Sequence, residues 1–276
     1  MVTRETVKNA TLEAGIVKGD ILLVHSSFKS MGEVDGGAES VIGGFLDAIG
    51  EEGTLVLPTL CQEDFLNSYK TWHMDKKSDV GYLTNYFRCR EGSYRSDQAT
   101  HSVAASGKKA KWLTENHGHT AKRWGNMGDT PFAPDSPWQK MYDEGAKVLL
   151  LGVTPMSITF RHFAEYIFVE ECLKSIEKRA DYNEMKNRLH CFERYFDLEA
   201  WPHIYSPTVF NLLTEKGLTG ESKCGNATFK TVPVREYVDT AIDLLRQGNE
   251  EVLWKVENGW KVEEWLEWLK DCKKEL

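Results

Sequence analysis

Three polar residues at regular spacing, Thr159, His162 and Glu165, are the strongest candidates for chemistry in this sequence. On a helix they would share one face, because they lie three residues apart. An imidazole beside a carboxylate can act as a general base with an orienting partner, although the same pair also occurs as a surface ion pair. The position of the His162–Glu165 pair in the sequence favours a catalytic role. The apolar run Val148–Leu151 predicts a buried strand just before it, and open α/β sheets bind ligands past their strand ends.

A second candidate stands at the end of another predicted buried strand, where His25-Ser26-Ser27 follows the apolar run 21–24. A Gly-rich turn at residues 32–37 comes next, and then a predicted helix over 38–49. Free backbone N–H groups at a strand end and a helix start can bind the phosphate or amide groups of a ligand. The turn matches neither GxGxxG nor a P-loop, and an ordinary glycine turn explains it equally well.

Other polar patterns point to less. Ser26 and Ser27 lack the GxSxG context of a serine nucleophile. His117 and His119 could reach one metal ion from a loop, but no HExxH motif accompanies them, so two solvated histidines are expected. The six cysteines are scattered without any CxxC spacing, which is typical of reduced thiols.

The elements that must position these residues alternate between apolar strands and amphipathic helices. Strands are expected at 21–24, 54–58, 102–105, 148–151 and within 221–232, and helices at 4–15, 38–49, 80–90, 108–115, 137–142, from 159, at 207–217 and at 234–246. The strand–loop–helix–strand unit over 21–58 predicts an α/β fold with a mixed, mainly parallel central sheet flanked by helices. Residues 61–79 and 116–137 are expected as loops, and 172–205 as an antiparallel ribbon.

Length and composition limit the class of protein. The 276 residues suffice for one domain, 1–276, with 172–205 as a candidate insertion and 250–276 as a Trp-rich helical tail. The net charge of −8 argues against a nucleic-acid partner and favours a neutral or cationic one. No apolar run is long enough to span a bilayer, and the N-terminus lacks a signal-peptide pattern. We therefore expect a cytoplasmic protein with no membrane contact.

Several short motifs follow one another in a specific order. They are Val24–Phe28 (VHSSF), Gly32–Gly37 (GxVxGG), Gly53–Pro58 (GTLxLP), Arg95-Ser96, Thr100–Gly107 (THSVAAxG), Ser136-Pro137, Leu149–Val153 (LLLGV) and Thr159–Glu165 (TxxHxxE). In this order they resemble the aminoglycoside 3-N-acetyltransferase family, also called the antibiotic N-acetyltransferases. The match covers residues 5–170 well and 206–246 loosely.

The resemblance implies the fold of that family, which is unrelated to the GNAT acetyltransferases. It implies direct transfer of an acetyl group from acetyl-CoA, without a metal, to a small cationic amine, the 3-amino group of a 2-deoxystreptamine antibiotic. By the same resemblance, His162 is the catalytic base, with Glu165 as its acidic partner. An imidazole beside a charged Glu165 should titrate at or above about pH 6 to 7. The implied coenzyme A contacts are His25, Ser26, Ser27, Val34, Gly36, Gly37, Ser102 and Thr159.

The sequence departs from the family where Asp97-Gln98-Ala99 replace the usual His-Pro ahead of Thr100, and where 172–205 and the tail match nothing. Three functions therefore stay open: an aminoglycoside acetyltransferase, an acyltransferase on another amine with no role in resistance, and a catalytically silent coenzyme A-binding protein. Retention of both His162 and Glu165 favours an enzyme, because a binding module needs no base. The oligomeric state is open, with a homodimer as one option.

Overall fold

The computed structural model describes residues 1–62, 65–189 and 201–253. The strands of this part are β1 (Ile21–Ser26), β2 (Thr54–Pro58), β3 (Tyr94–Arg95), β4 (Val103–Gly107), β5 (Lys147–Leu151), β6 (Gly220–Cys224) and β7 (Ala227–Pro233). They form one seven-stranded sheet in the order β3-β4-β2-β1-β5-β7-β6. β1 therefore lies between its two partners from later in the chain, β2 and β5.

The predicted mixed α/β fold is confirmed, but the sheet is not mainly parallel. Parallel pairing is confined to β1 with β2 and β1 with β5, whereas β4 pairs antiparallel to β2 and β7 antiparallel to β5. The outer strands run antiparallel for a local reason. β6 and β7 are joined by the two residues Gly225-Asn226, and a connection this short can only return the chain antiparallel.

The three parallel strands are buried on both faces, which explains their continuous apolar runs. Successive side chains of a strand point to opposite faces. One core accordingly contains Leu23, Val56 and Leu150, and the core on the other face contains Leu22, Leu55 and Leu149. The central strands are thus packed between two hydrophobic cores, which fixes the positions of the strand ends.

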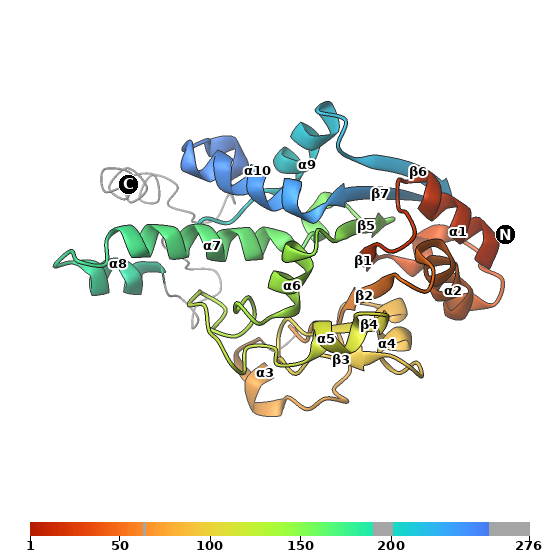
Figure 1. The fold of residues 1–276 in the computed structure, drawn as a ribbon, viewed down its shortest axis with the longest axis horizontal. Helices are drawn as coiled ribbons and strands as arrows, with labels where there is room; N and C mark the ends of the chain where they lie inside the picture. The colour runs from red at the N-terminus through yellow and green to blue at the C-terminus, as the bar shows by residue number, and fades with distance from the viewer. Residues whose placement is uncertain (63–64, 190–200, 254–276) are drawn as a thin grey trace.

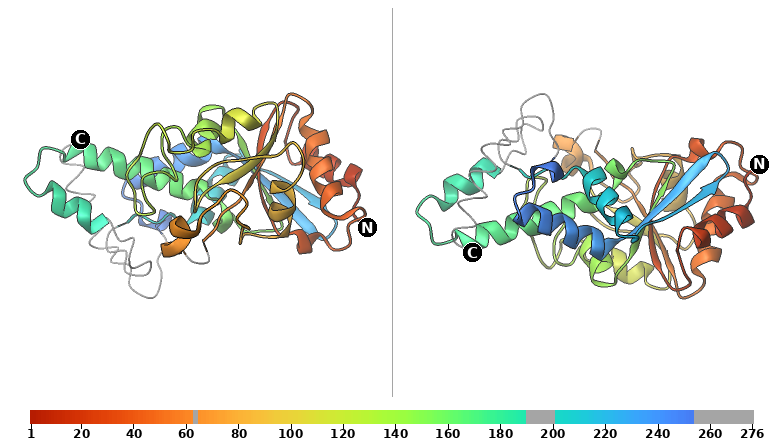
Figure 2. Two further views of the ribbon diagram at one scale, coloured as in Figure 1. Left: turned by 90° about the horizontal axis from the view of Figure 1, so that it is seen from below. Right: turned by 90° about the horizontal axis from the view of Figure 1, so that it is seen from above.

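Helices cover both faces of the sheet. They are α1 (Arg4–Glu13), α2 (Gly37–Ile49), α3 (Phe65–Thr71), α4 (Tyr82–Arg88), α5 (Ala110–Thr114), α6 (Pro137–Asp143), α7 (Phe160–Ser175), α8 (Tyr182–Leu189), α9 (Ser206–Glu215) and α10 (Val234–Arg246). In Figure 1, α1 and α2 lie on one side of the sheet, and α6, α7 and α10 lie on the other. Figure 2 shows that α7 and α10 run away from the sheet side by side, and they contact each other along their length. No described helix has the length and apolar character needed to cross a bilayer.

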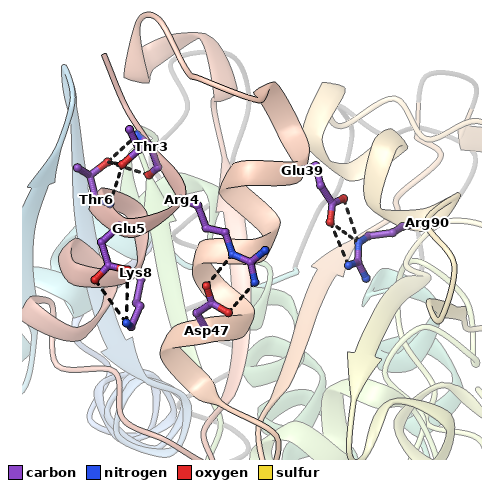
Figure 3. A network of polar contacts seen from close by, with 8 residues as sticks. All are labelled: Thr3, Arg4, Glu5, Thr6, Lys8, Glu39, Asp47 and Arg90. Carbon is purple, nitrogen blue, oxygen red and sulfur yellow. Dashed lines mark hydrogen bonds and ion pairs between the residues drawn. The ribbon is translucent and has the colours of Figure 1, made fainter.

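Helix α2, which follows the glycine turn, packs against α1. The helices approach closely at Gly44, where a Cβ atom would lie 2.6 Å from that of Val7. Figure 3 shows the polar contacts around this interface, in which Arg4 donates to both carboxylate oxygens of Asp47 at 2.6 and 2.7 Å. This ion pair is partly exposed and therefore contributes little stability, so buried packing holds the helices together.

Two segments differ from the sequence prediction. Helix α3 lies within the predicted loop 61–79, and the predicted ribbon over 172–205 is wrong, because α7 continues to Ser175 and α8 follows. The buried residues Phe168, Val169 and Cys172 continue the apolar stripe of α7 at helical spacing. This stripe keeps the segment helical to Ser175, although many of its other residues are charged. Residues 116–137 contain no helix or strand before Pro137, as predicted. Residues 190–200 and the predicted tail helix after 253 lie outside the described residues. The single-domain assignment stays a prediction.

Candidate active site

A cavity of about 340 Å³ lies past the carboxyl ends of β1, β2 and β5. The residues with polar side chains that matter most for its chemistry are His25, Ser26, His101, Thr159, Arg161 and His162. A larger and more open hollow of about 910 Å³ lies beside it and contains Lys76 and Lys77. The two share one wall, because Val80 and Thr84 line the first and Gly81 lines the second.

The sheet topology explains why a cavity forms here. β2 is placed on one side of β1 and β5 on the other, so the connections leave β1 in opposite directions and a crevice opens past the strand ends. β4 is antiparallel to β2, so its first residue lies at the same edge. His101, two residues before β4, therefore reaches the cavity although it is distant from His162 in sequence.

His162 lies on the first turn of α7, immediately after the β5 loop, and its side chain is 14% exposed. Its Nδ1 is 2.9 Å from Oε2 of Glu165, and Nε of Arg161 donates to its Nε2 at 3.2 Å. Since a guanidinium can only donate, Nε2 is an acceptor, and the proton on Nδ1 is donated to Glu165. Burial, and next the Arg161 charge, lower the pKa of His162 well below 6.5. The ring is therefore a neutral base whose basic nitrogen faces the cavity.

Glu165 lies beneath His162 and is fully buried. Its Oε2 also accepts from Nε1 of Trp201 at 2.9 Å, and its Oε1 accepts from the backbone N–H of Ile204 at 2.8 Å. Burial raises the pKa of Glu165, and His203, Arg161 and these N–H donors work against that rise. Three N–H groups directed at two oxygens match an ionised carboxylate, which only accepts, so we assign Glu165 as charged.

The structure brings together several of the residues that the sequence singled out. The cavity is lined by His25, Ser26, Thr159 and His162, and Glu165 accepts a hydrogen bond from His162. Burial lowers the pKa of His25 to about 4, and its Nε2 has no hydrogen-bond partner among the described residues. A buried nitrogen without a partner costs free energy, which makes this side of the cavity a suitable contact for a polar ligand atom.

The remaining predicted coenzyme contacts lie outside this cavity. The hydroxyl of Ser102 donates to the Thr59 carbonyl oxygen at 2.9 Å, and the backbone N–H of Ser27 donates to Leu151 at 2.8 Å. Val34, Gly36 and Gly37 form the turn that leads into α2, with positive φ angles of 70° and 61° at the two glycines. Ser27 and Ser102 thus stabilise the backbone beside the cavity. The glycine turn could contact only a part of coenzyme A that lies outside the cavity.

Sequence reasoning missed four residues of the site. His101, Gln62 and Arg161 line the cavity, and Trp201 contacts Glu165. Only His101 carried a signal, since it belongs to the Thr-His-Ser motif. Arg161 was not singled out by any sequence pattern, and Trp201 lies in the segment 172–205 that matched no pattern.

The two loop histidines, His117 and His119, lie in different surroundings. His117 is buried, with Nδ1 beside the Ser96 hydroxyl and Nε2 beside the Pro131 carbonyl, both at 2.9 Å, so the expectation of two solvated histidines was wrong for it. Elsewhere His162, Glu165 and His203 offer ligand atoms within 4.8 Å of one another. The carboxylate of that cluster already accepts three N–H groups. The absence of a metal stays a prediction.

Buried neutral histidines predict a protein that loses stability in mild acid. Burial lowers the pKa of His117 to about 4 and that of His203 to about 3. The unfolded chain binds a proton near pH 6.5 at each, so the stability they contribute is present above that pH and is lost as the pH falls. We expect the free energy of unfolding to drop by about 2 kcal/mol per buried histidine between pH 7 and pH 5, measured by urea unfolding.

The matched variants are His117→Gln and His119→Gln. The first should flatten this pH dependence, and the second should leave it in place, because His119 is largely exposed. Equal slopes in all three proteins would mean that His117 is not held neutral in the fold.

Together, the fold and the site define an α/β protein with a buried histidine–glutamate pair that faces a cavity at the ends of parallel strands. Comparison with known sequences identifies the family of this protein. The family model described as aminoglycoside 3-N-acetyltransferase matches residues 23–246, which is most of the chain. The chain belongs to this family.

Sequence relatives agree with this assignment, and solved structures share the fold. Aminoglycoside N(3)-acetyltransferase VII of Streptomyces paromomycinus is 31% identical over 182 residues, which cover 59% of this chain and 60% of that protein. The match thus spans about three fifths of the relative. Among solved structures, the aminoglycoside acetyltransferase AAC(3)-IVa apoenzyme has a TM-score of 0.68 at 22% identity and covers 98% of this chain and 97% of its own. AAC-IIIb, solved as a binary complex with CoASH, has a TM-score of 0.67 at 17% identity and covers 92% and 98%. At these identities the structures support the fold.

Proposed function

We propose that this protein is an acetyl-CoA-dependent N-acetyltransferase that uses His162 as general base for direct transfer to an amine. The observation that carries the proposal is the neutral imidazole whose Nε2 accepts a hydrogen bond from Arg161 at the cavity wall while its Nδ1–H donates to a buried carboxylate. An ammonium must lose a proton before it can attack a thioester, and His162 can take that proton. The Arg161 contact to Nε2 must open first, because it occupies the position of the amine N–H.

The cavity suits the reactive end of acetyl-CoA. A volume of about 340 Å³ holds an acyl thioester and part of the pantetheine arm, but not the nucleotide. His25 offers a buried nitrogen to an amide of the arm, and Thr159 offers a hydroxyl beside His162. The adjoining hollow, with Lys76 and Lys77, and the turn at Gly36-Gly37 are the places for the phosphates. When bound, acetyl-CoA supplies the activated acetyl group.

Two acceptor classes have support. The names of the relatives favour the 3-amino group of an aminoglycoside, and a variant of AAC(3)-IVa with a similar fold was solved in complex with a gentamicin, with a TM-score of 0.71. A different amine is favoured by the cavity itself, where the described lining contains the cation Arg161 and no aspartate or glutamate. A polycation would be repelled by such a wall, although Glu63 and Asp64 lie outside the described residues. A homodimer stays a prediction.

A thiol-release assay with acetyl-CoA tests the proposal. Purified protein is mixed with acetyl-CoA and a panel of gentamicin, apramycin, neutral amino sugars and simple amines, and free coenzyme A is followed by thiol detection. Amine-dependent release that is lost in His162→Ala supports the function, and the panel ranks the two acceptor classes. Tight coenzyme A binding without release for any amine would favour the silent binding protein.

The glycine turn gives a prediction about coenzyme binding. A Cβ atom at Gly37 would meet nothing within 4 Å, so Gly37→Ala introduces only the cost of a positive φ and a methyl group at the turn surface. If coenzyme phosphates contact this backbone, its affinity should fall about tenfold in calorimetric titration, with little change in turnover at saturation.

Gly217→Ala is the matched control, because Gly217 also has a positive φ of 71° and open space around it, in the turn between α9 and β6. It should bind coenzyme A as the unmodified protein does. Unchanged affinity in Gly37→Ala would remove the turn from the binding site.

A further inference from the structure

The segment 201–205 contacts the buried carboxylate of Glu165 beside His162. Trp201 Nε1 and the Ile204 backbone N–H each donate to one oxygen of Glu165, and Nδ1 of His203 lies 3.8 Å from Oε2. The segment is itself anchored, because the N–H of Tyr205 donates to Val252 at 2.7 Å. These residues lie about forty positions after Glu165, so this contact is a feature of the tertiary structure alone.

We propose that Trp201 is a positioning residue for the transfer reaction: its ring N–H holds the Glu165 carboxylate charged and aligned, and so keeps Nε2 of His162 as the proton acceptor. The inference rests on the proposed function and assigns a role within it. Ile204 assists through its backbone, which no side-chain substitution can remove. Trp201 is therefore the place where the role can be tested.

The indole is held in place by packing, as a positioning role requires. Trp201 is 2% exposed, and its ring packs edge-on against Tyr166 with centroids 5.2 Å apart. The hydroxyl of Tyr166 is fixed in turn by the Met127 N–H at 2.8 Å. Trp124 also packs against the Trp201 ring, with ring centroids 6.2 Å apart. The ring has little freedom, so its N–H stays directed at Oε2.

The charges around Glu165 explain why one N–H matters. The titratable and charged groups facing it are Arg161 and His162 on its own helix, Tyr166 one residue on, His203 from the segment 201–205 and Tyr237 from α10. His203 is neutral and both tyrosines keep their protons, since burial raises their pKa values. Arg161 is the single formal positive charge in this set. The buried carboxylate therefore depends on N–H donors for the stabilisation that water would otherwise provide.

Protonation of either His162 or Glu165 prevents Nε2 of His162 from acting as the base. A proton on His162 occupies Nε2 directly. A proton on Glu165 turns the carboxylate into a donor, which favours the tautomer that carries its hydrogen on Nε2. Losing the Trp201 N–H destabilises the charged carboxylate, so the pair should take up its first proton at higher pH. A merely structural tryptophan would lower stability without moving this step.

The decisive variant is Trp201→Phe, which keeps an aromatic ring and removes the donor. Turnover should fall about tenfold, the Michaelis constant for acetyl-CoA should stay unchanged, and the acid limb of the pH–rate profile should move up by about one pH unit. A site-specific benzothienyl analogue of Trp201, with sulfur in place of the ring N–H, preserves the shape and should reproduce the same shift. Trp124→Phe alters the packing against the same ring but leaves the ring N–H of Trp201 in place, so its acid limb should match that of the unmodified protein.

An acid limb that is unchanged or shifted downward in both the phenylalanine variant and the benzothienyl analogue overturns the role of Trp201. If Trp201→Phe does not fold, the benzothienyl analogue alone decides. These pH–rate profiles can be measured only if the unmodified protein acetylates an amine. No release by the unmodified protein, or full release by His162→Ala, would instead reject the proposed function and is a separate result.

Discussion

Replacing His162 by alanine should reduce turnover about a hundredfold or more while acetyl-CoA binding stays close to that of the unmodified protein. The variant removes the nitrogen that accepts the amine proton, and general-base catalysis is worth about 10² to 10⁴ in rate. Binding should persist because His25, Ser26 and Thr159 still line the cavity. The measurements are steady-state turnover at saturating substrates and calorimetric titration of coenzyme A.

His119→Ala is the matched control, since it removes an imidazole that is 52% exposed and has no place in the cavity. Its turnover should equal that of the unmodified protein. The fold of His162→Ala should survive, because Glu165 keeps its contacts to Trp201 and Ile204. Turnover near the normal value in a folded His162→Ala protein would remove His162 as the base.

Replacing Glu165 by glutamine should cause the second large loss, again about a hundredfold in turnover, and should move the acid limb to lower pH. Both carboxylate oxygens accept N–H groups. A glutamine must therefore turn its NH₂ toward Ile204 or toward His162 and Trp201, where a donor faces a donor. The loss of an orienting carboxylate typically costs about 10- to 100-fold, and the buried mismatch adds to it.

The sign of the pH shift follows from the charges. A charged Glu165 favours the protonated form of His162, so its removal lowers the pKa of the imidazole, and the neutral base survives to lower pH. The expected shift is opposite to that of Trp201→Phe, which distinguishes loss of the charge from loss of the group that holds it. The measurement is a pH–rate profile at saturating substrates. Identical acid limbs in Glu165→Gln and the unmodified protein would mean that Glu165 does not interact with the base.

The position of the acid limb also changes from the expectation based on sequence. An imidazole beside a carboxylate predicts an inflection at or above about pH 6 to 7. In the fold, burial and the Arg161 guanidinium lower the pKa of His162 well below 6.5. The acid limb of the unmodified protein should therefore lie below pH 6.5.

Local patterns in the sequence determined the elements and the central pair. The helix predicted over 234–246 has those bounds in the structure, because its apolar stripe and the following Gly248 are local signals. The pairing of His162 with Glu165 follows from helical spacing, since one turn of a helix places residues three apart side by side whatever surrounds them. The central strands were visible because burial on both faces leaves an unbroken apolar run.

The tertiary structure alone decided what surrounds that pair. The antiparallel pairing of β4 brings His101 to the cavity, and the segment 201–205 brings Trp201 and Ile204 to Glu165 across about forty residues. No spacing rule links such positions, because chain reversals between them set which side chains meet. The electrostatic state of His162 was equally out of reach, since burial and the direction of the Arg161 side chain exist only in the folded protein.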